Sequence, residues 1–441
     1  MQQLKPLTLR RNFSWTFTGN LVYAASQWGM LVVLAKLGRP EMLGQFTLGL
    51  AVTAPVFMLT NLQLRSIQAT DAKHEYLFGD YLGLRLIGIF LGILIVAGIA
   101  IAAGYRWETS LVILTLALAK GFESISDVFY GLIQNHERMD RIAISLMIKG
   151  PLSLVMLGIG VYSTRTVLGG VVGLTVAWAF LLFTFDVRSG ALLLKSPPLL
   201  EGENLPELAL QSSVVIKNPL QPRWDWKTLV KLIWLALPLG LVMMLISLNT
   251  NIPRYFIERY LGERELGIFG AISYLMVAGT MVISSLGHSA SPRLAKYYAA
   301  GDSAAFRKLL FKLVQFGFGL GGAVVLVAMV VGRQLLALIY RPEYAEQADI
   351  LVWLMIAAGI GYGCSFLSSA LTAARCFRIQ LPLFTLVTGA SATTGLWLIP
   401  AYGLRGAAFA LIIASVVQLF LSLGIIFYVL HQISRYSKTE S

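Results

Sequence analysis

The chain has 441 residues, of which 57% are hydrophobic and 13% are charged, and its mean hydropathy is +0.72. Soluble domains carry about 25% charged residues, so this composition excludes an ordinary soluble globular protein. The net charge is +13, from 35 Lys and Arg against 22 Asp and Glu. In so apolar a chain, we expect the positive excess on cytoplasmic loops and beside anionic lipids, and we expect no nucleic acid among its partners.

Apolar segments long enough to cross a bilayer recur along the chain. A membrane-spanning helix needs about 20 mainly apolar residues, and about twelve segments satisfy that requirement. They occupy residues 14–37, 43–64, 82–104, 109–132, 142–163, 167–187, 229–250, 266–288, 309–332, 348–373, 381–400 and 405–430. The predicted fold class is therefore an all-α polytopic membrane protein with about 12 transmembrane helices.

The distribution of Lys and Arg predicts how the chain is oriented and divided. These residues concentrate on the connections that share a side with the N-terminus, which favours cytoplasmic N- and C-termini. One of these connections is long and contains five prolines within residues 197–222, as expected of an extended linker. We predict an N-terminal six-helix bundle at 1–190, a cytoplasmic linker at 191–228 and a C-terminal six-helix bundle at 229–441.

A short pattern recurs at equivalent places in the two predicted bundles. Leu43, Gly44 and Phe46 form a Leu-Gly-x-Phe sequence after the first span, and the same sequence begins at Leu266 after the seventh span. Internal repeats of this kind are common in transporters. The pattern favours a duplicated architecture, although chance similarity between Leu- and Gly-rich segments is the alternative.

Motifs that carry enzymatic or metal chemistry are missing. A Gly-x-Gly-x-x-Gly pattern at 317–322 lies inside an apolar span with no strand before it, so it predicts close helix packing and not dinucleotide binding. The chain has no P-loop sequence, and its four histidines lack the spacing of metal ligands. We therefore expect no cofactor, no metal site and no enzymatic activity.

The fourth and fifth predicted spans carry charge. Lys120, Glu123 and Asp127 have the spacing i, i+3 and i+7, which places them on one face of a helix. Lys149 stands just before Pro151 in the next span, at a similar depth from the inner edge. The spacing predicts that Lys120 pairs with Glu123. It also allows Lys149 to pair across the hairpin with Glu123 or Asp127.

Two interpretations of this charged hairpin stay open. The ion pairs could serve only to lock the two helices together. Alternatively, the lysines bind an anionic substrate in a hydrated site, and Glu123 or Asp127 carries a coupling proton. We favour the second interpretation because charge at bilayer depth costs several kcal/mol and usually has a function. Further polar groups within spans suit a hydroxyl-rich ligand or hydrogen bonds between helices: Asn20, Gln27, Asn61, Asn249 and Asn251.

Three stretches resemble a known family. The sequence LQLRSIQATDAKHEYLFGDYLGLRL at 62–86 is similar to the region after the second span of bacterial polysaccharide-biosynthesis flippases. The sequences at 249–279 and 291–302 resemble the seventh and eighth spans of the same proteins. These are O-antigen-type (Wzx-like) flippases of the multidrug/oligosaccharidyl-lipid/polysaccharide (MOP) exporter superfamily. The resemblance covers most of the chain.

The resemblance implies two six-helix bundles around a central cavity that opens alternately to each side of the bacterial cytoplasmic membrane. It implies a substrate of oligosaccharide joined through pyrophosphate to undecaprenol, which moves from the inner to the outer leaflet. The candidates for binding the anionic headgroup are Lys120, Lys149, Arg65 and Arg254. Membrane lipids, glycosyltransferases and a polysaccharide polymerase are the partners that this function implies.

Two other functions remain as alternatives. A cation-coupled multidrug exporter has the same fold but needs an acidic cavity, and the charges assigned to this cavity are balanced or basic. A membrane-embedded glycosyltransferase or glycan polymerase usually carries a large outer loop or an acidic catalytic pair. The predicted outer loops are mostly short, so the sequence favours the flippase.

Overall fold

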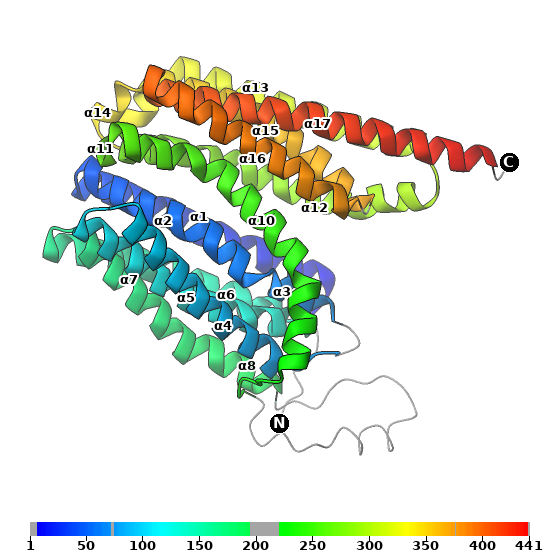
Figure 1. The fold of residues 1–441 in the computed structure, drawn as a ribbon, viewed down its shortest axis with the longest axis horizontal. Helices are drawn as coiled ribbons and strands as arrows, with labels where there is room; N and C mark the ends of the chain where they lie inside the picture. The colour runs from blue at the N-terminus through cyan, green and yellow to red at the C-terminus, as the bar shows by residue number, and fades with distance from the viewer. Residues whose placement is uncertain (1–6, 72–74, 195–219, 375, 440–441) are drawn as a thin grey trace. The chain divides into compact units, whose positions relative to one another are not determined.

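A computed structural model describes residues 7–71, 75–194, 220–374 and 376–439. Within these ranges the regular secondary structure is entirely helical (Figure 1). The first half contains α1 (Leu9–Leu37), α2 (Pro40–Asn61), α3 (Leu64–Thr70), α4 (Phe78–Ala102), α5 (Trp107–Asn135), α6 (Met139–Thr164), α7 (Val167–Leu181), the π-helical turn η1 (Leu182–Asp186) and α8 (Val187–Leu194). The second half contains α10 (Trp226–Leu261), α11 (Glu263–Tyr274), α12 (Met276–Ala299), α13 (Ser303–Ile339), α14 (Pro342–Ala345), α15 (Ala348–Ala373), α16 (Phe377–Tyr402) and α17 (Leu404–Thr439).

The helices make this a multi-pass membrane protein, as predicted. Within the described residues, ten helical segments are long and apolar enough to cross a bilayer. The first and fourth predicted spans form α1 and α5, which are helices of 29 residues each but are not among those ten. Polar side chains interrupt α1, and the three charges at 120, 123 and 127 interrupt α5.

Several helices extend beyond the apolar segments that predicted them. The sixth span, predicted to end at residue 187, continues through η1 and α8 to Leu194. The second span breaks after Asn61, where Leu62 and Gln63 adopt left-handed backbone conformations with φ of 52° and 53°. Such conformations are uncommon for residues other than glycine. Here they turn the chain from α2 into the short helix α3.

The chain separates into two compact units, and each is described by itself. One unit comprises Met1–Met30 and Val56–Leu241, and the other comprises Leu31–Pro55 and Val242–Ser441. We call them the N-terminal and the C-terminal unit. Their boundaries pass within α1, α2 and α10. The predicted linker at 191–228 stays a prediction, because 195–219 lie outside the described residues.

The N-terminal unit has an apolar core formed by α3, α4, α5 and the first part of α10, with Leu64, Tyr81 and Val128 buried in it. The segment that leads into α10 packs on the start of α4. The backbone N–H of Arg223 donates to the carbonyl of Gly79 at 2.8 Å, and a side chain at Gly79 would collide with this segment. This contact fixes the beginning of α10 on α4.

The C-terminal unit is built on close contacts among α12, α13, α15, α16 and α17. Phe306 and Phe366 are buried in its core. Gly321 of α13 allows a close approach to α15, because a β-carbon at this position would lie 2.5 Å from the Cα of Gly359. Close packing therefore accounts for Gly321 and for Gly317, which packs on Phe366, whereas Gly319 and Gly322 of the predicted motif have open space around them.

The repeated Leu-Gly-x-Phe sequence forms a contact of its own within the C-terminal unit. A β-carbon at Gly44, in the first turns of α2, would collide with the backbone carbonyl of Glu263 at the start of α11. A β-carbon at Gly267 would collide with the carbonyl of Pro40 at the start of α2. The contact is reciprocal, since each glycine packs on the residue four positions before the other. Gln45 adds a hydrogen bond of 3.0 Å to Glu263.

Candidate functional site: a charged cluster in the N-terminal unit

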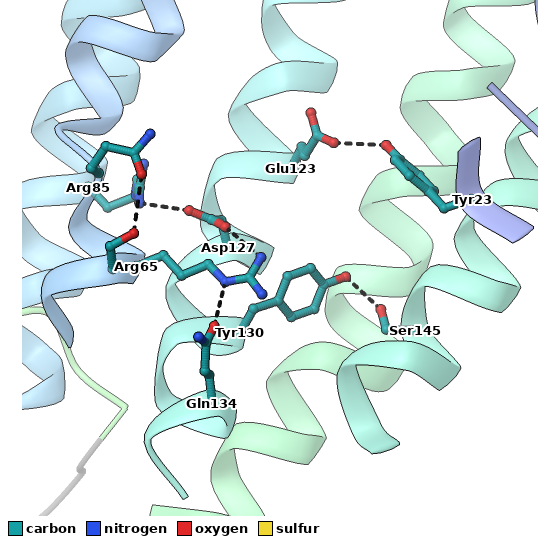
Figure 2. A network of polar contacts seen from close by, with 10 residues as sticks. Tyr23, Arg65, Arg85, Glu123, Asp127, Tyr130, Gln134 and Ser145 are labelled. Atoms are coloured by element: carbon teal, nitrogen blue, oxygen red, sulfur yellow. Dashed lines mark hydrogen bonds and ion pairs between the residues drawn. The ribbon is translucent and has the colours of Figure 1, made fainter. Parts of the chain in front are cut away.

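Helices α3, α4 and α5 bring two arginines to one carboxylate (Figure 2). Arg65 of α3 lies 3.4 Å from one oxygen of Asp127, and Arg85 of α4 lies 3.1 Å from the other. Arg65 also donates a hydrogen bond of 3.2 Å to Gln134 and lies over the ring of Tyr130, 5.5 Å from its centroid. The break between α2 and α3 positions Arg65, since it turns α3 toward α5.

Arg85 has an unusual environment for a charged residue. Its side chain is fully buried, and its Nε and Nη1 atoms have no hydrogen-bond partner among the described residues. A buried guanidinium is costly unless it is paired, and Asp127 supplies its only ion pair within the described part of the chain. The sequence analysis did not single out Arg85, because it stands near the inner end of the predicted span 82–104, where a positive charge is expected.

A second ion pair lies about one turn along α5. The Lys120 Nζ atom lies 2.7 Å from Glu123, as the spacing predicts. The Tyr23 hydroxyl of α1 donates to the other oxygen of the same carboxylate at 2.9 Å (Figure 2). Both charged side chains of the pair are about a quarter exposed, so this part of the cluster remains accessible.

Lys149 does not make the ion pair that its depth allows. Its side chain is 2% exposed, and within the described residues its Nζ makes no ion pair with Glu123 or Asp127. It lies instead over the indole ring of Trp178, 4.8 Å from the ring centroid. Both carboxylates already have other partners: two arginines pair with Asp127, and Lys120 and Tyr23 bind Glu123.

Two lysines thus share one aromatic ring. The Nζ atom of Lys120 lies 5.4 Å from the Trp178 centroid, compared with 4.8 Å for Lys149. The indole N–H donates to Ser153 at 2.7 Å, and the Ser153 hydroxyl donates to the backbone carbonyl of Lys149 at 2.5 Å. The cation–π contacts partly offset the repulsion between the two ammonium groups. Trp178 was not singled out from the sequence.

A further carboxylate belongs to this cluster and was also missed. Asp186 ends the π-helical turn η1 and is fully buried. It accepts a hydrogen bond of 2.7 Å from Ser145, whose hydroxyl lies 2.7 Å from that of Tyr130. Its other oxygen has no hydrogen-bond partner in the described structure. The prediction ended the sixth span at residue 187, which made Asp186 a residue of the membrane edge.

The C-terminal unit contains the remaining predicted cation. Arg254 of α10 donates to the side chain of Asn251 at 2.9 Å and to Ser273 at 3.5 Å. Its Nε atom is buried without a hydrogen-bond partner, and Arg254 makes no ion pair within the described residues. Since these partners are neutral, the positive charge of Arg254 is not balanced by a direct carboxylate contact.

The predicted polar residues divide between the two units. Asn20 is exposed and donates to the carbonyl of Thr16, whereas Asn251 also donates to Ser247. Three others each have a buried side-chain atom without a hydrogen-bond partner among the described residues: Gln27, Asn61 and Asn249. Their roles in substrate binding stay predictions.

The described residues contain no group of three or more His, Cys, Asp or Glu side chains that could hold a metal ion. The N-terminal cluster instead combines four cations with three carboxylates: Arg65, Arg85, Lys120 and Lys149 against Glu123, Asp127 and Asp186. Such a cluster favours the binding of an anion.

Sequence and structure comparisons show which known proteins this chain resembles. Residues 238–374 match the MatE family model. The capsular polysaccharide biosynthesis protein CapF of Staphylococcus aureus is 28% identical over 409 residues, which cover 93% of this chain and 97% of CapF. The MatE match covers less than half of the chain, and the fold of the whole chain is similar to that of MATE family transporters.

Solved structures show how far the MOP fold extends along the chain. An inward-facing multidrug resistance MATE family transporter is similar over 94% of this chain and 96% of its own length, with a TM-score of 0.69 and 14% identity. The lipid II flippase MurJ, in an inward closed conformation, is similar over 96% of this chain and 90% of its own length, with a TM-score of 0.68 and 14% identity. These relatives are transporters and flippases.

Proposed function

We propose that this protein is a flippase that moves an oligosaccharide, linked through pyrophosphate to undecaprenol, from the inner to the outer leaflet of the bacterial cytoplasmic membrane. It acts by alternating access between two bundles, with both termini in the cytoplasm. Glycosyltransferases that build the oligosaccharide act before it, and a polysaccharide polymerase acts after it. The similarity to CapF supports a place in polysaccharide biosynthesis.

The observation that carries this proposal is the excess of positive charge within the membrane-spanning helices. Among the described residues, four cations accompany three carboxylates in the N-terminal cluster, and the hydrogen-bond partners of Arg254 in the C-terminal unit are neutral. Charges at bilayer depth are expensive and commonly mark a substrate path. A pyrophosphate group is attracted by this excess, whereas a cationic drug is repelled.

A flipping assay tests the proposal. The purified protein is reconstituted in liposomes with a fluorescent undecaprenyl-pyrophosphate oligosaccharide, and flipping is followed by the fraction of fluorophore that impermeant dithionite reduces. We expect flipping by the unmodified chain and a large loss in Arg254→Gln. Arg259→Gln is the matched control, because Arg259 is an exposed cation near the end of the same helix. Absence of flipping by the unmodified chain contradicts the proposal.

The same function can be tested in cells. Removal of the protein is expected to leave undecaprenyl-linked oligosaccharide on the inner leaflet, because synthesis continues while export stops. Unchanged lipid distribution in cells without the protein is the opposing result.

A multidrug exporter is the second candidate, and the MatE match over residues 238–374 favours it. This function requires that cationic amphipathic compounds cross liposomes containing the protein in exchange for protons or sodium ions. We expect no such transport, because the cluster is cationic. Ion-coupled transport of a cationic dye, together with no flipping of the lipid-linked substrate, would support the exporter and contradict the flippase.

A further inference from the structure

Glu123 occupies a position in which an anion is held by groups from two helices. One carboxylate oxygen lies 2.7 Å from the Nζ atom of Lys120, and the other accepts a hydrogen bond of 2.9 Å from the Tyr23 hydroxyl. Figure 2 shows the carboxylate pointing away from Asp127 and toward Tyr23. The positive groups that act on it most strongly are Lys120 and Lys149.

The charges around Glu123 do not balance. Lys120 and Lys149 both lie over Trp178, and Glu123 is the carboxylate that acts most strongly on Lys149. Asp127 cannot supply the missing charge, because its two oxygens are taken by two arginines. Asp186 also acts on Lys149, but more weakly than Glu123 and without an ion pair among the described residues, so Glu123 is the main counter-charge of both ammonium groups. A ligand with two negative charges matches them better.

The Glu123 side chain is also partly accessible. Its side chain is 28% exposed, in contrast to the 2% exposure of Lys149. Lys149 is thus a buried cation without a direct carboxylate contact among the described residues, near a carboxylate that is partly exposed. A carboxylate and a phosphoryl group accept hydrogen bonds from the same donors, and Lys and Tyr are donors to both.

We infer that Glu123 is a tethered competitor that fills the anion site of Lys120, Lys149 and Tyr23 until the pyrophosphate of a substrate displaces it. The two phosphates then take the place of one carboxylate, and each lysine gains its own counter-charge. When the pyrophosphate leaves, Glu123 returns and the lysines are neutralised again. Glu123 thereby limits the affinity for the headgroup and favours its release. This inference rests on the proposed function for the identity of the ligand.

Binding of inorganic pyrophosphate tests the inference without requiring flipping. Isothermal titration calorimetry of the full chain in detergent compares the unmodified protein with Glu123→Gln, which removes the charge and keeps the shape. We expect about tenfold tighter binding in Glu123→Gln, equivalent to about 1.4 kcal/mol, because the competing anion is gone. Lys120→Gln is expected to weaken binding. Glu108→Gln is the matched control, since Glu108 is an exposed carboxylate in the first turn of the same helix.

Each outcome has a distinct meaning. Equal or weaker pyrophosphate binding by both Glu123→Gln and Glu123→Ala overturns the competitor role, even if the unmodified chain flips its lipid substrate. Tighter binding by either folded variant supports the role, even if no flipping is detected. In a chain that flips, we also expect Glu123→Gln to turn over more slowly at saturating substrate, because headgroup release is slower.

Discussion

Gly44 of α2 and Gly267 of α11 pack reciprocally on each other's helix starts within the C-terminal unit. They are the glycines of the repeated Leu-Gly-x-Phe sequence, and they stand at equivalent positions in the two copies. The two copies of the repeat therefore pack on each other, which the sequence did not predict. The two copies do not merely resemble each other, since each provides the surface on which the other packs.

Substitution of Gly44 tests this contact. The β-carbon of Gly44→Ala would meet the backbone of Glu263, which cannot move aside as a flexible side chain can. Overpacking of this kind typically costs about 1–3 kcal/mol, so we expect a lower midpoint of thermal unfolding for the purified protein. Gly319→Ala is the control, because a β-carbon there has open space around it. Equal midpoints for the two variants would show that the contact is not tight.

We expect replacement of the buried Arg85 to lower the stability of the protein. Its replacement by Met leaves Asp127 with Arg65 alone and removes the buried half of the arrangement. Because Asp127 keeps Arg65 and is partly exposed, the expected cost is that of one hydrogen bond between charged groups, about 1.5–3 kcal/mol, and thermal unfolding in detergent measures the loss. Arg106→Met, at an exposed position before α5, should have little effect. The double variant Arg85→Met with Asp127→Asn should lose less than the sum of the two single variants.

Lys149 separates the two interpretations of the charged hairpin. We expect Lys149→Ala to insert and fold but to lose flipping, because it removes one of the two ammonium groups over Trp178. The measurement is flipping per folded protein in liposomes, with folding checked by size-exclusion chromatography. Flipping at the unmodified rate would assign Lys149 a packing role only. Lys308→Ala, on the polar first turns of α13, is the matched control.

The hydrogen bonds around Asp186 give a further prediction. Ser145→Ala removes the hydroxyl that lies between Asp186 and Tyr130, and leaves two buried oxygens without that partner. An unsatisfied buried group costs about 1–3 kcal/mol, so thermal stability should fall. Ser163→Ala should be neutral, because the Ser163 hydroxyl is exposed and donates to the carbonyl of Ile159 in its own helix. Similar midpoints for both variants would contradict the importance of this connection.

The sequence predicted the fold class and part of the cluster because both depend on local patterns. The apolar segments predicted the helices, and the spacing of Lys120 and Glu123 predicted their ion pair. Depth alone could not predict the partner of Lys149. That partner depends on which side chains from other helices pair with Asp127 and Glu123. This depends on how the helices pack, which cannot be read from a single sequence.

Two residues of the cluster were not predicted from the sequence. Both lie near the ends of apolar segments, and the apolar pattern does not show where the helices begin and end. Arg85 stands near the start of an apolar span, and Asp186 stands near the end of another. In the structure, α4 begins at Phe78 and the sixth helical segment continues to Leu194. Both residues therefore lie well inside helices, whereas the predicted spans 82–104 and 167–187 placed them near a membrane surface, where charge is expected.

The reciprocal packing of Gly44 and Gly267 has an evolutionary consequence. A half-length polypeptide carrying the Leu-Gly-x-Phe stretch once would present a self-complementary surface, as in a two-fold symmetric dimer. Gene duplication and fusion would then join two subunits that already recognised each other. After fusion, neither copy of the glycine is free to drift by itself, because a larger side chain on one would displace the backbone of the other.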